Sequence, residues 1–237
     1  MSFSYESTTI GANGQVNEMQ KIQTIVWDWN GTLLDDVELC RHTINRLLVK
    51  RGLKRLDLEQ YRRVFQFPII EYYRKAGFDL EAEPFEVLAH EYMAYYQPRS
   101  IQCALQEGTQ QVLRLFQHTG LRQVLLSASR LDLLKEQLAH YPIEDRFDQV
   151  LGISDVYAHS KAALAKRFVA QSGQPADTIL FVGDSVHDHE VASAAGCRCV
   201  LVAAGHEHKE KLLRCGCETV DQVSELPALL GIVPEVG

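Results

Sequence analysis

The stretch IVWDWNGTLLDD, residues 25–36, carries the strongest indication of the fold. The apolar residues that lead into it predict a buried strand over residues 22–27. Asp28 follows the strand directly, and the turn-forming pair Asn30-Gly31 comes two residues later. An acidic side chain placed directly after a buried strand projects from the end of a sheet. Open α/β sheets bind their ligands at that edge.

Further apolar runs and helical patterns alternate along the rest of the chain. Strands are predicted at residues 22–27, 123–126, 178–182 and 199–202, and helices at 109–118, 132–140, 161–172, 189–195, 209–215 and 222–230. This alternation predicts an α/β fold with a doubly wound parallel sheet. Asp28, Ser127 and Asp184 each follow directly on a predicted strand, so we expect them to share one crevice at the carboxyl edge of the sheet.

One long segment breaks the alternation. Between residues 36 and 106 there is no strand pattern, only helical stretches such as the one that places Leu39, Ile44 and Leu47 on a single face. We therefore predict an insertion of four or five helices. The predicted organisation is a disordered polar tail at 1–20, a core domain at 21–35 and 107–237, and an inserted helical domain at 36–106.

Composition and charge narrow the class of protein. The 237 residues are 46% hydrophobic and 23% charged, which suits a globular core, and the net charge of −7 argues against nucleic-acid or anionic-membrane partners. No apolar run reaches the roughly 18 residues of a membrane span. The first residues lack the pattern of a secretory signal, and the six cysteines fit reduced thiols. We expect a cytoplasmic protein, either a monomer or a homodimer.

Four segments together resemble the haloacid dehalogenase superfamily of hydrolases. The loop Asp-Trp-Asn-Gly-Thr from Asp28 is similar to the nucleophile loop of that family, and Ser127 in QVLLSAS matches its phosphate-binding hydroxyl. Lys161 in AHSKAALAKRF matches the lysine of the third motif. Asp184 and Asp188 in GDSVHD match the acidic fourth motif. The resemblance runs from about residue 24 to residue 230.

The resemblance implies a Rossmann-like core with a helical cap and a Mg²⁺-dependent phosphatase similar to phosphoglycolate phosphatases. Its substrate would be a small phosphorylated metabolite, cleaved through an aspartyl phosphate. The implied catalytic residues are Asp28, Asn30 and Lys161. Phosphate binding is implied for Gly31, Thr32, Ser127, Ala128 and Lys161, and Mg²⁺ binding for Asp28, Asn30 through its backbone carbonyl, Asp184 and Asp188.

The departure from the family pattern is Asn30, where relatives carry a second aspartate that moves protons. An asparagine cannot exchange a proton near neutral pH, and general acid–base catalysis contributes about 10²–10⁴ in rate. Slow hydrolysis of the phosphorylated intermediate is therefore expected. Asn30→Asp tests this expectation. A large gain in rate would indicate that turnover of the wild type is impaired, and equal rates would indicate that another base replaces the missing acid.

Three functional interpretations stay open. The leading one is a slow phosphatase, or one that uses another base such as His187 or a residue of the helical cap. The second is a phosphate-binding protein with little turnover. The third is a protein similar to phosphonoacetaldehyde hydrolases, which cleave a C–P bond with a Schiff-base lysine in the cap; Lys50, Lys54 and Lys75 lie in the predicted cap.

The remaining cysteine, histidine and arginine candidates have structural interpretations. Two Cys-x-Cys pairs, from Cys197 and Cys215, have a spacing that occurs in zinc sites, but free cysteine is also a common core residue. We predict core packing. For His206 and His208 two interpretations stay open: a place at the edge of the site and, as the leading one, solvation or helix capping. Arg130 either reaches the substrate or starts a helix.

Overall fold

The core of the protein is a six-stranded parallel sheet. The computed structural model describes residues 21–153 and 160–232, so the predicted tail at 1–20 lies outside the described residues. The strand order is β5-β4-β1-β6-β7-β8, and every neighbouring pair is parallel. The strands are β1 (Thr24–Trp27), β4 (Arg122–Arg130), β5 (Gln149–Ile153), β6 (Ile179–Gly183), β7 (Arg198–Val202) and β8 (Glu218–Val220). The predicted α/β fold with a doubly wound parallel sheet is confirmed.

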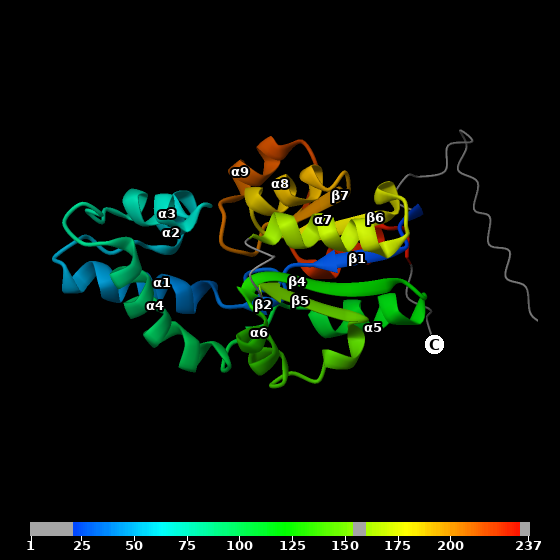
Figure 1. Ribbon diagram of the computed structural model, residues 1–237, viewed down its shortest axis with the longest axis horizontal. Helices are drawn as coiled ribbons and strands as arrows, with labels where there is room; N and C mark the ends of the chain where they lie inside the picture. The colour runs from blue at the N-terminus through cyan, green and yellow to red at the C-terminus, as the bar shows by residue number, and fades with distance from the viewer. Residues whose placement is uncertain (1–20, 154–159, 233–237) are drawn as a thin grey trace, which may run out of the picture.

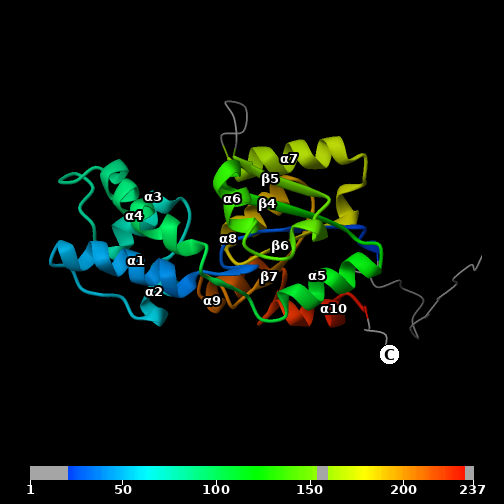
Figure 2. The same cartoon turned by 90° about the horizontal axis from the view of Figure 1, so that it is seen from below.

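Helices cover both faces of this sheet (Figures 1 and 2). Phe116 and Leu134 pack on the face that carries Trp27, whereas Leu164 packs on the face that carries Val26. Neighbouring residues of a strand point to opposite faces, so β1 contributes to both clusters. The helices of the first face are α5 (Thr109–His118), α6 (Leu131–Leu138) and α10 (Leu226–Leu229); those of the second are α7 (Lys161–Ser172), α8 (Val186–Ala194) and α9 (Lys209–Leu212).

The strand order places a crevice beside β1. After β1 the chain builds β4 and β5 on one side, and it then returns to build β6, β7 and β8 on the other. The loops that leave the carboxyl ends of neighbouring strands diverge at such a switch point, which leaves room for a ligand. Asp28 follows β1 and so stands at this position.

Four helices form a separate unit at one end of the molecule (Figure 1). This four-helix unit consists of α1 (Val37–Lys50), α2 (Leu58–Val64), α3 (Ile69–Ala76) and α4 (Phe85–Ser100). It has its own hydrophobic cluster, in which Ile44 and Leu48 of α1 pack with Tyr73 of α3 and Leu88 of α4. No helix in the described part of the chain is both long and apolar enough to cross a membrane.

A short hairpin-like sheet joins the two connections of the four-helix unit. Strand β2 (Leu34–Asp35) pairs antiparallel with β3 (Ala104–Leu105). The expectation of no strand between residues 36 and 106 is therefore wrong for β3, because two residues are too few to form a recognisable pattern. Next to β3, the Gln106 side chain donates a hydrogen bond to the carbonyl of Gly31 over 3.2 Å. The hinge of the unit thus touches the loop that follows β1.

Two further strand predictions need correction. Strand β4 runs on through Ser127 to Arg130, with a register shift after Leu126, so Ser127 lies within a strand rather than after it. Strands β5 and β8 were not predicted. Both lie at the edges of the sheet, where partial exposure removes the continuous apolar run that marks a buried strand.

Candidate active site

Two carboxylates from neighbouring strands meet at the switch point. Asp28 follows β1, and its backbone N–H donates to the carbonyl of Val182 in β6 over 2.8 Å. Asp184 follows the end of β6. The hydroxyl of Thr32 lies 3.2 Å from Asp184 Oδ1 and 3.5 Å from Asp28 Oδ2. The parallel pairing of β1 and β6 therefore brings the acids together.

The loop after β1 requires a glycine at its tightest point. The carbonyl of Trp29 accepts hydrogen bonds from three amide groups that follow it, which curls the loop into a compact turn. Gly31 has a φ of +75°, and a Cβ atom there would lie 2.4 Å from Asp184 Oδ2 and 2.5 Å from His206 Cδ2. Any side chain at position 31 would therefore displace the carboxylate or the imidazole.

Three carboxylates form a cluster suited to a cation. Oxygen atoms of Asp28, Asp184 and Asp188 all lie within 4.8 Å of one another. Burial, with the neighbouring Asp188 charge, raises the pKa of Asp28 to about 6, although Lys161 opposes the rise. Burial and the other two carboxylates raise the pKa of Asp184 to about 7, although His206 opposes that rise. A buried oxygen-only set whose members repel one another fits a hard cation such as Mg²⁺.

Lys161 supplies the positive charge of the cluster. It opens α7, whose N-cap Ser160 accepts a hydrogen bond from the Ala163 amide. Its Nζ is in ion-pair contact with Asp28 Oδ1 and, over 2.5 Å, with Asp188 Oδ1. The Lys161 side chain is only 6% exposed. Because the lysine is buried between two acids, it is a structural part of the site and not a solvated surface charge.

Asp188 is held rigidly on the first turn of α8. Its Oδ2 accepts hydrogen bonds from the Ser185 hydroxyl over 2.6 Å and from the backbone amides of Asp184 and Ser185. Burial opposes ionisation, but Lys161 and these donors hold the pKa of Asp188 below its usual range. Gly183 makes this approach possible, because a Cβ atom there would lie 2.2 Å from Asp188 Cγ.

The predicted phosphate-binding residues occupy different surroundings. Gly31 uses its own N–H to donate to Asp36 Oδ1 over 2.9 Å, so its contribution to a ligand would be space rather than a donor. The Ser127 side chain is buried and accepts a hydrogen bond from the Ser129 amide over 3.1 Å, whereas Ala128 is exposed. The roles of Gly31, Ser127 and Ala128 in phosphate binding stay predictions.

Sequence reasoning missed a buried polar network beside the acids. His206 Nε2 lies 3.1 Å from Asp36 Oδ1, and these residues are 4% and 1% exposed. Tyr61 of α2 contacts His206 Nδ1 over 2.8 Å, and Tyr96 of α4 donates to Asp36 Oδ2 over 2.6 Å. The four-helix unit thus contributes two hydroxyl groups to a charged pair in the core.

The leading expectation for His206, solvation or helix capping, is wrong. Its ring is covered by Phe65, which stacks on it at 4.9 Å between centroids, and its backbone N–H donates to Asp184 Oδ2 over 2.6 Å. A histidine in a polar loop carries no sequence signal of this environment. His208 does cap a helix, because its side chain accepts a hydrogen bond from the Glu210 amide at the start of α9.

The other candidates have structural surroundings. His187 stacks on Phe67 at 4.8 Å, and Arg130 pairs with Asp132 at the start of α6. Within residues 21–153 and 160–232, three potential metal ligands lie close together at two places, around Asp28 and around Asp36. Neither place includes a residue of a Cys-x-Cys pair. Those cysteines pack in or against a core cluster, as predicted.

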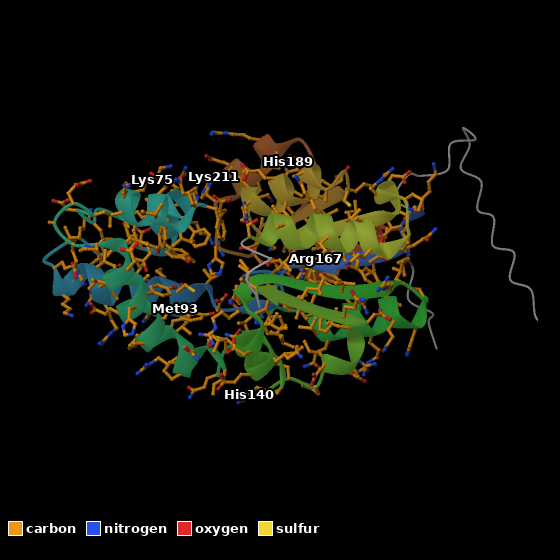
Figure 3. All side chains as sticks on the ribbon, viewed as in Figure 1. Lys75, Met93, His140, Arg167, His189 and Lys211 are labelled. Atoms are coloured by element: carbon orange, nitrogen blue, oxygen red, sulfur yellow. The ribbon has the colours of Figure 1, made fainter. Side chains whose placement is uncertain are left out.

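The four-helix unit makes direct contacts with the segment that follows β7. Arg62 Nη2 donates to the carbonyl of Ala204 over 2.6 Å, and the His208 amide donates to the carbonyl of Arg62 over 3.1 Å. Lys211, which lies between the unit and the core (Figure 3), donates to the carbonyl of Phe65 over 2.5 Å. These contacts join the α2 side of the four-helix unit to the core beside the site.

The Asp36–His206 pair predicts that folding stability falls above neutral pH. Burial alone would lower the pKa of His206, but the Asp36 carboxylate raises it to about 9. This folded-state pKa lies above the unfolded value of 6.5. The stabilisation is therefore fully present below about pH 6.5 and is lost as the pH rises through 9. The shift corresponds to about 3 kcal/mol of unfolding free energy.

Urea unfolding of the metal-free protein at pH 6 and pH 9.5 measures this loss. His206→Gln should show a much smaller decrease between the two pH values, whereas Asp28 and Asp184 titrate in both proteins. An equal pH dependence of wild type and variant would contradict the prediction.

Comparisons with known proteins agree with this architecture. Residues 25–202 match the family model described as haloacid dehalogenase-like hydrolase. The chain is 26% identical over 234 residues to a phosphoglycolate phosphatase of Neisseria gonorrhoeae, covering 92% of this chain and 93% of that protein. It is 23% identical over 191 residues to a 5'-nucleotidase of Pseudomonas aeruginosa, covering 79% and 86%.

Solved structures show the same fold at low sequence identity. A haloacid dehalogenase-like hydrolase family protein of Streptococcus pneumoniae superposes with a TM-score of 0.74 at 18% identity, covering 88% of this chain and 97% of that one. Protein tyrosine kinase A of Mycobacterium tuberculosis superposes with a TM-score of 0.73 at 23% identity, covering 89% and 99%. The fold is thus shared by proteins whose names indicate different activities.

Proposed function

The chain belongs to the haloacid dehalogenase-like hydrolases, and from that membership we propose that it hydrolyses a small phosphate monoester through an intermediate on Asp28. The contact of Lys161 with both Asp28 and Asp188 carries the proposal. A buried cation at this place can bind the substrate phosphate and offset its repulsion from the nucleophile. The relatives named phosphoglycolate phosphatase support a small phosphorylated metabolite as the substrate.

The proposed chemistry proceeds in two displacements. A carboxylate oxygen of Asp28 attacks phosphorus, and the bond between phosphorus and the ester oxygen breaks as the new O–P bond forms. The ester oxygen leaves and takes up a proton from solvent water. Water then attacks the phosphorus of the aspartyl phosphate and gives up a proton to solvent, and the bond between phosphorus and the Asp28 oxygen breaks, which releases inorganic phosphate and restores Asp28. Lys161 and the Thr32 hydroxyl would hold non-bridging oxygens during both steps.

The acidic cluster supports Mg²⁺ as the cofactor. Asp28, Asp184 and the backbone carbonyl of Asn30 would hold the ion. When bound, it would neutralise charge that develops on the phosphoryl oxygens. Asp188 already has one oxygen engaged by Lys161 and the other by Ser185. This supports a place for Asp188 in orienting the site rather than as a direct ligand.

Proton transfer is the weak step of this site. The Asn30 side chain acts as an amide donor to Asp36 and Tyr96, and it cannot deliver a proton to the leaving group. The missing acid–base function is worth about 10²–10⁴ in rate. We therefore propose slow turnover limited by hydrolysis of the aspartyl phosphate.

The surroundings of three lysines in the four-helix unit do not favour the alternative of a Schiff-base lysine. Lys50, Lys54 and Lys75 all have exposed side chains. Lys50 pairs with Glu91 over 3.0 Å, and Lys75 (labelled in Figure 3) is hydrogen-bonded to Gln66. A lysine that forms a Schiff base is usually desolvated, which lowers its pKa and leaves a free amine.

A substrate screen tests the proposed function. Phosphoglycolate, other small phosphate esters and phosphonoacetaldehyde would each be incubated with the full chain and Mg²⁺, and released phosphate measured over hours. We expect slow hydrolysis of at least one ester and a phosphorylated Asp28 in acid-quenched samples. Cleavage of phosphonoacetaldehyde alone would overturn the proposal. Phosphate binding without any cleavage would favour a binding protein.

Mg²⁺ is expected to stabilise the fold through the acidic cluster. At 100 times its dissociation constant a ligand adds about 2.7 kcal/mol, or roughly 5–10 °C for a domain of this size. The increase should be larger at pH 8 than at pH 5.5, because the raised pKa values of Asp28 and Asp184 mean that Mg²⁺ must displace protons.

Thermal unfolding of wild type, Asp184→Asn and Asp177→Asn with and without Mg²⁺ measures this effect. Asp177 is exposed at the opposite end of β6, so its substitution is a matched control. A Mg²⁺ effect that survives in Asp184→Asn would contradict the assignment of the site.

A further inference from the structure

Asn30, Asp36 and Tyr96 form a closed triangle of hydrogen bonds. Asn30 Nδ2 lies 3.0 Å from Asp36 Oδ2 and 2.7 Å from the Tyr96 hydroxyl, and that hydroxyl donates to Asp36 Oδ2 over 2.6 Å. We infer that Asn30 and Asp36 are a matched pair, in which Asp36 is the positioning residue for Asn30 and carries the negative charge in its place.

The surroundings of Asp36 require an acceptor at that position. Its Oδ1 accepts from the Gly31 amide over 2.9 Å and faces His206 Nε2 at 3.1 Å. Its Oδ2 accepts from Tyr96 and faces the Cys40 thiol at 3.5 Å. Burial by itself opposes ionisation of Asp36, but the facing histidine and the surrounding hydrogen-bond donors favour its negative charge.

The surroundings of Asn30 require an amide at that position. The Asn30 Oδ1 atom accepts from the Ser129 hydroxyl over 3.2 Å, while the nitrogen faces Asp36 and Tyr96. The opposite orientation of the amide would set its oxygen against the Asp36 carboxylate, so the network itself decides which end is nitrogen. Both ends of the side chain are therefore in use.

The pair explains why an aspartate at position 30 is not a simple repair. Asn30→Asp would place a second carboxylate oxygen about 3 Å from Asp36 Oδ2, in contact with a partner that is itself a charged acceptor. The Tyr96 hydroxyl has one hydrogen and can donate to only one of the two. The single substitution should therefore destabilise the nucleophile loop and should not raise turnover.

Exchanging the two residues should restore the network. In Asn30→Asp with Asp36→Asn, the new amide at position 36 donates to the new carboxylate at position 30, and the Tyr96 hydroxyl rotates to follow. The amide oxygen introduced at position 36 can still accept from the Gly31 amide, and the carboxylate at position 30 can still accept from Ser129. The exchange reverses the direction of the central bond and keeps one carboxylate in the pair.

The pair also links the four-helix unit to the nucleophile loop. Asp36 is the N-cap residue of α1, and Tyr96 belongs to α4 close to the return connection. One residue next to each connection of the unit, Asp36 or Tyr96, thus hydrogen-bonds to Asn30, which lies two residues from Asp28. This part of the inference rests on the proposed function, because it predicts an effect of the pair on turnover as well as on stability.

A double-mutant cycle tests the pair. Unfolding equilibria at pH 8 without metal would be measured for wild type, Asn30→Asp, Asp36→Asn and the exchange. For residues in direct contact we expect a favourable coupling of about tenfold or more in the unfolding equilibrium constant. The matched control combines Asn30→Asp with Asp35→Asn, which removes an exposed carboxylate one residue away. That control should show no rescue.

Kinetics on the best ester from the screen give the second measurement. We expect Asn30→Asp to have no higher kcat than wild type, and the exchange to exceed Asn30→Asp at least about tenfold in kcat, within the range of general acid–base catalysis. Absence of coupling, or equal rescue by Asp35→Asn, would overturn the matched pair even if the wild type hydrolyses esters. Strong coupling with no hydrolysis by any variant would support the pair and overturn the proposed function.

Discussion

Asp28→Asn is expected to abolish turnover, with kcat reduced by at least about 10⁴-fold, because an amide cannot attack phosphorus. The fold should survive, because asparagine has the same shape and the substitution removes one of three clustered carboxylates. Burial already raises the pKa of Asp28 to about 6, so its charge is not what stabilises the metal-free protein.

Three measurements check this result. Phosphate release from the best ester should fall to the background rate, acid-quenched samples should contain no phosphoprotein, and thermal unfolding should show an intact domain. Asp177→Asn makes the same chemical change at the opposite edge of the sheet and should leave kcat unchanged. Metal-dependent hydrolysis that persists in Asp28→Asn would overturn the proposed mechanism.

Lys161→Met is expected to impair both stability and turnover. Removing one partner of a buried ion pair typically costs about 3–5 kcal/mol, because the remaining charge stays buried without compensation. Here two carboxylates, those of Asp28 and Asp188, would lose the same cation. Loss of a charge-stabilising donor at a reacting group costs about 10²–10³ in kcat.

Lys166→Met provides the matched control, because Lys166 lies on the same helix with an exposed side chain. Urea unfolding should show a large loss of free energy for Lys161→Met and almost none for Lys166→Met. Mg²⁺ should restore part of the stability of Lys161→Met, because a cation in the acidic cluster supplies the missing positive charge. Equal unfolding free energies for the two variants would show that the ion pairs do not stabilise the fold.

Much of the fold follows from local patterns along the chain. The predicted helices at 109–118 and 161–172 coincide with α5 and α7, and the four central strands were predicted to within a few residues. Those strands are buried on both faces, which produces continuous apolar runs. Edge strands such as β5, and the two-residue strands β2 and β3, owe their existence to pairing with distant segments. Their own residues contain little of that information.

Some residues of the proposed site are recognisable from the sequence, and others are found only in the structure. Asp28 and Asp184 are recognisable because each follows a buried strand, and Lys161 because it opens a helix within a recognisable motif. The structure brings these residues together with Asp188. Asp36 and His206 escaped recognition because they lie 170 positions apart and occupy polar segments. Only the packing of α2 and α4 over the loop after β7 buries them and makes them a charged pair.

The sequence by itself determined the parallel sheet, its switch point and the order of acidic and basic groups at that edge. Periodicity and strand-end position are local properties, so they can be read along the chain. Only the tertiary structure decided the meaning of Asn30. Along the chain it is a missing acid, whereas in space its amide is fully engaged by Asp36, Tyr96 and Ser129. A hydrogen-bond network depends on which side chains meet, and that is determined by packing.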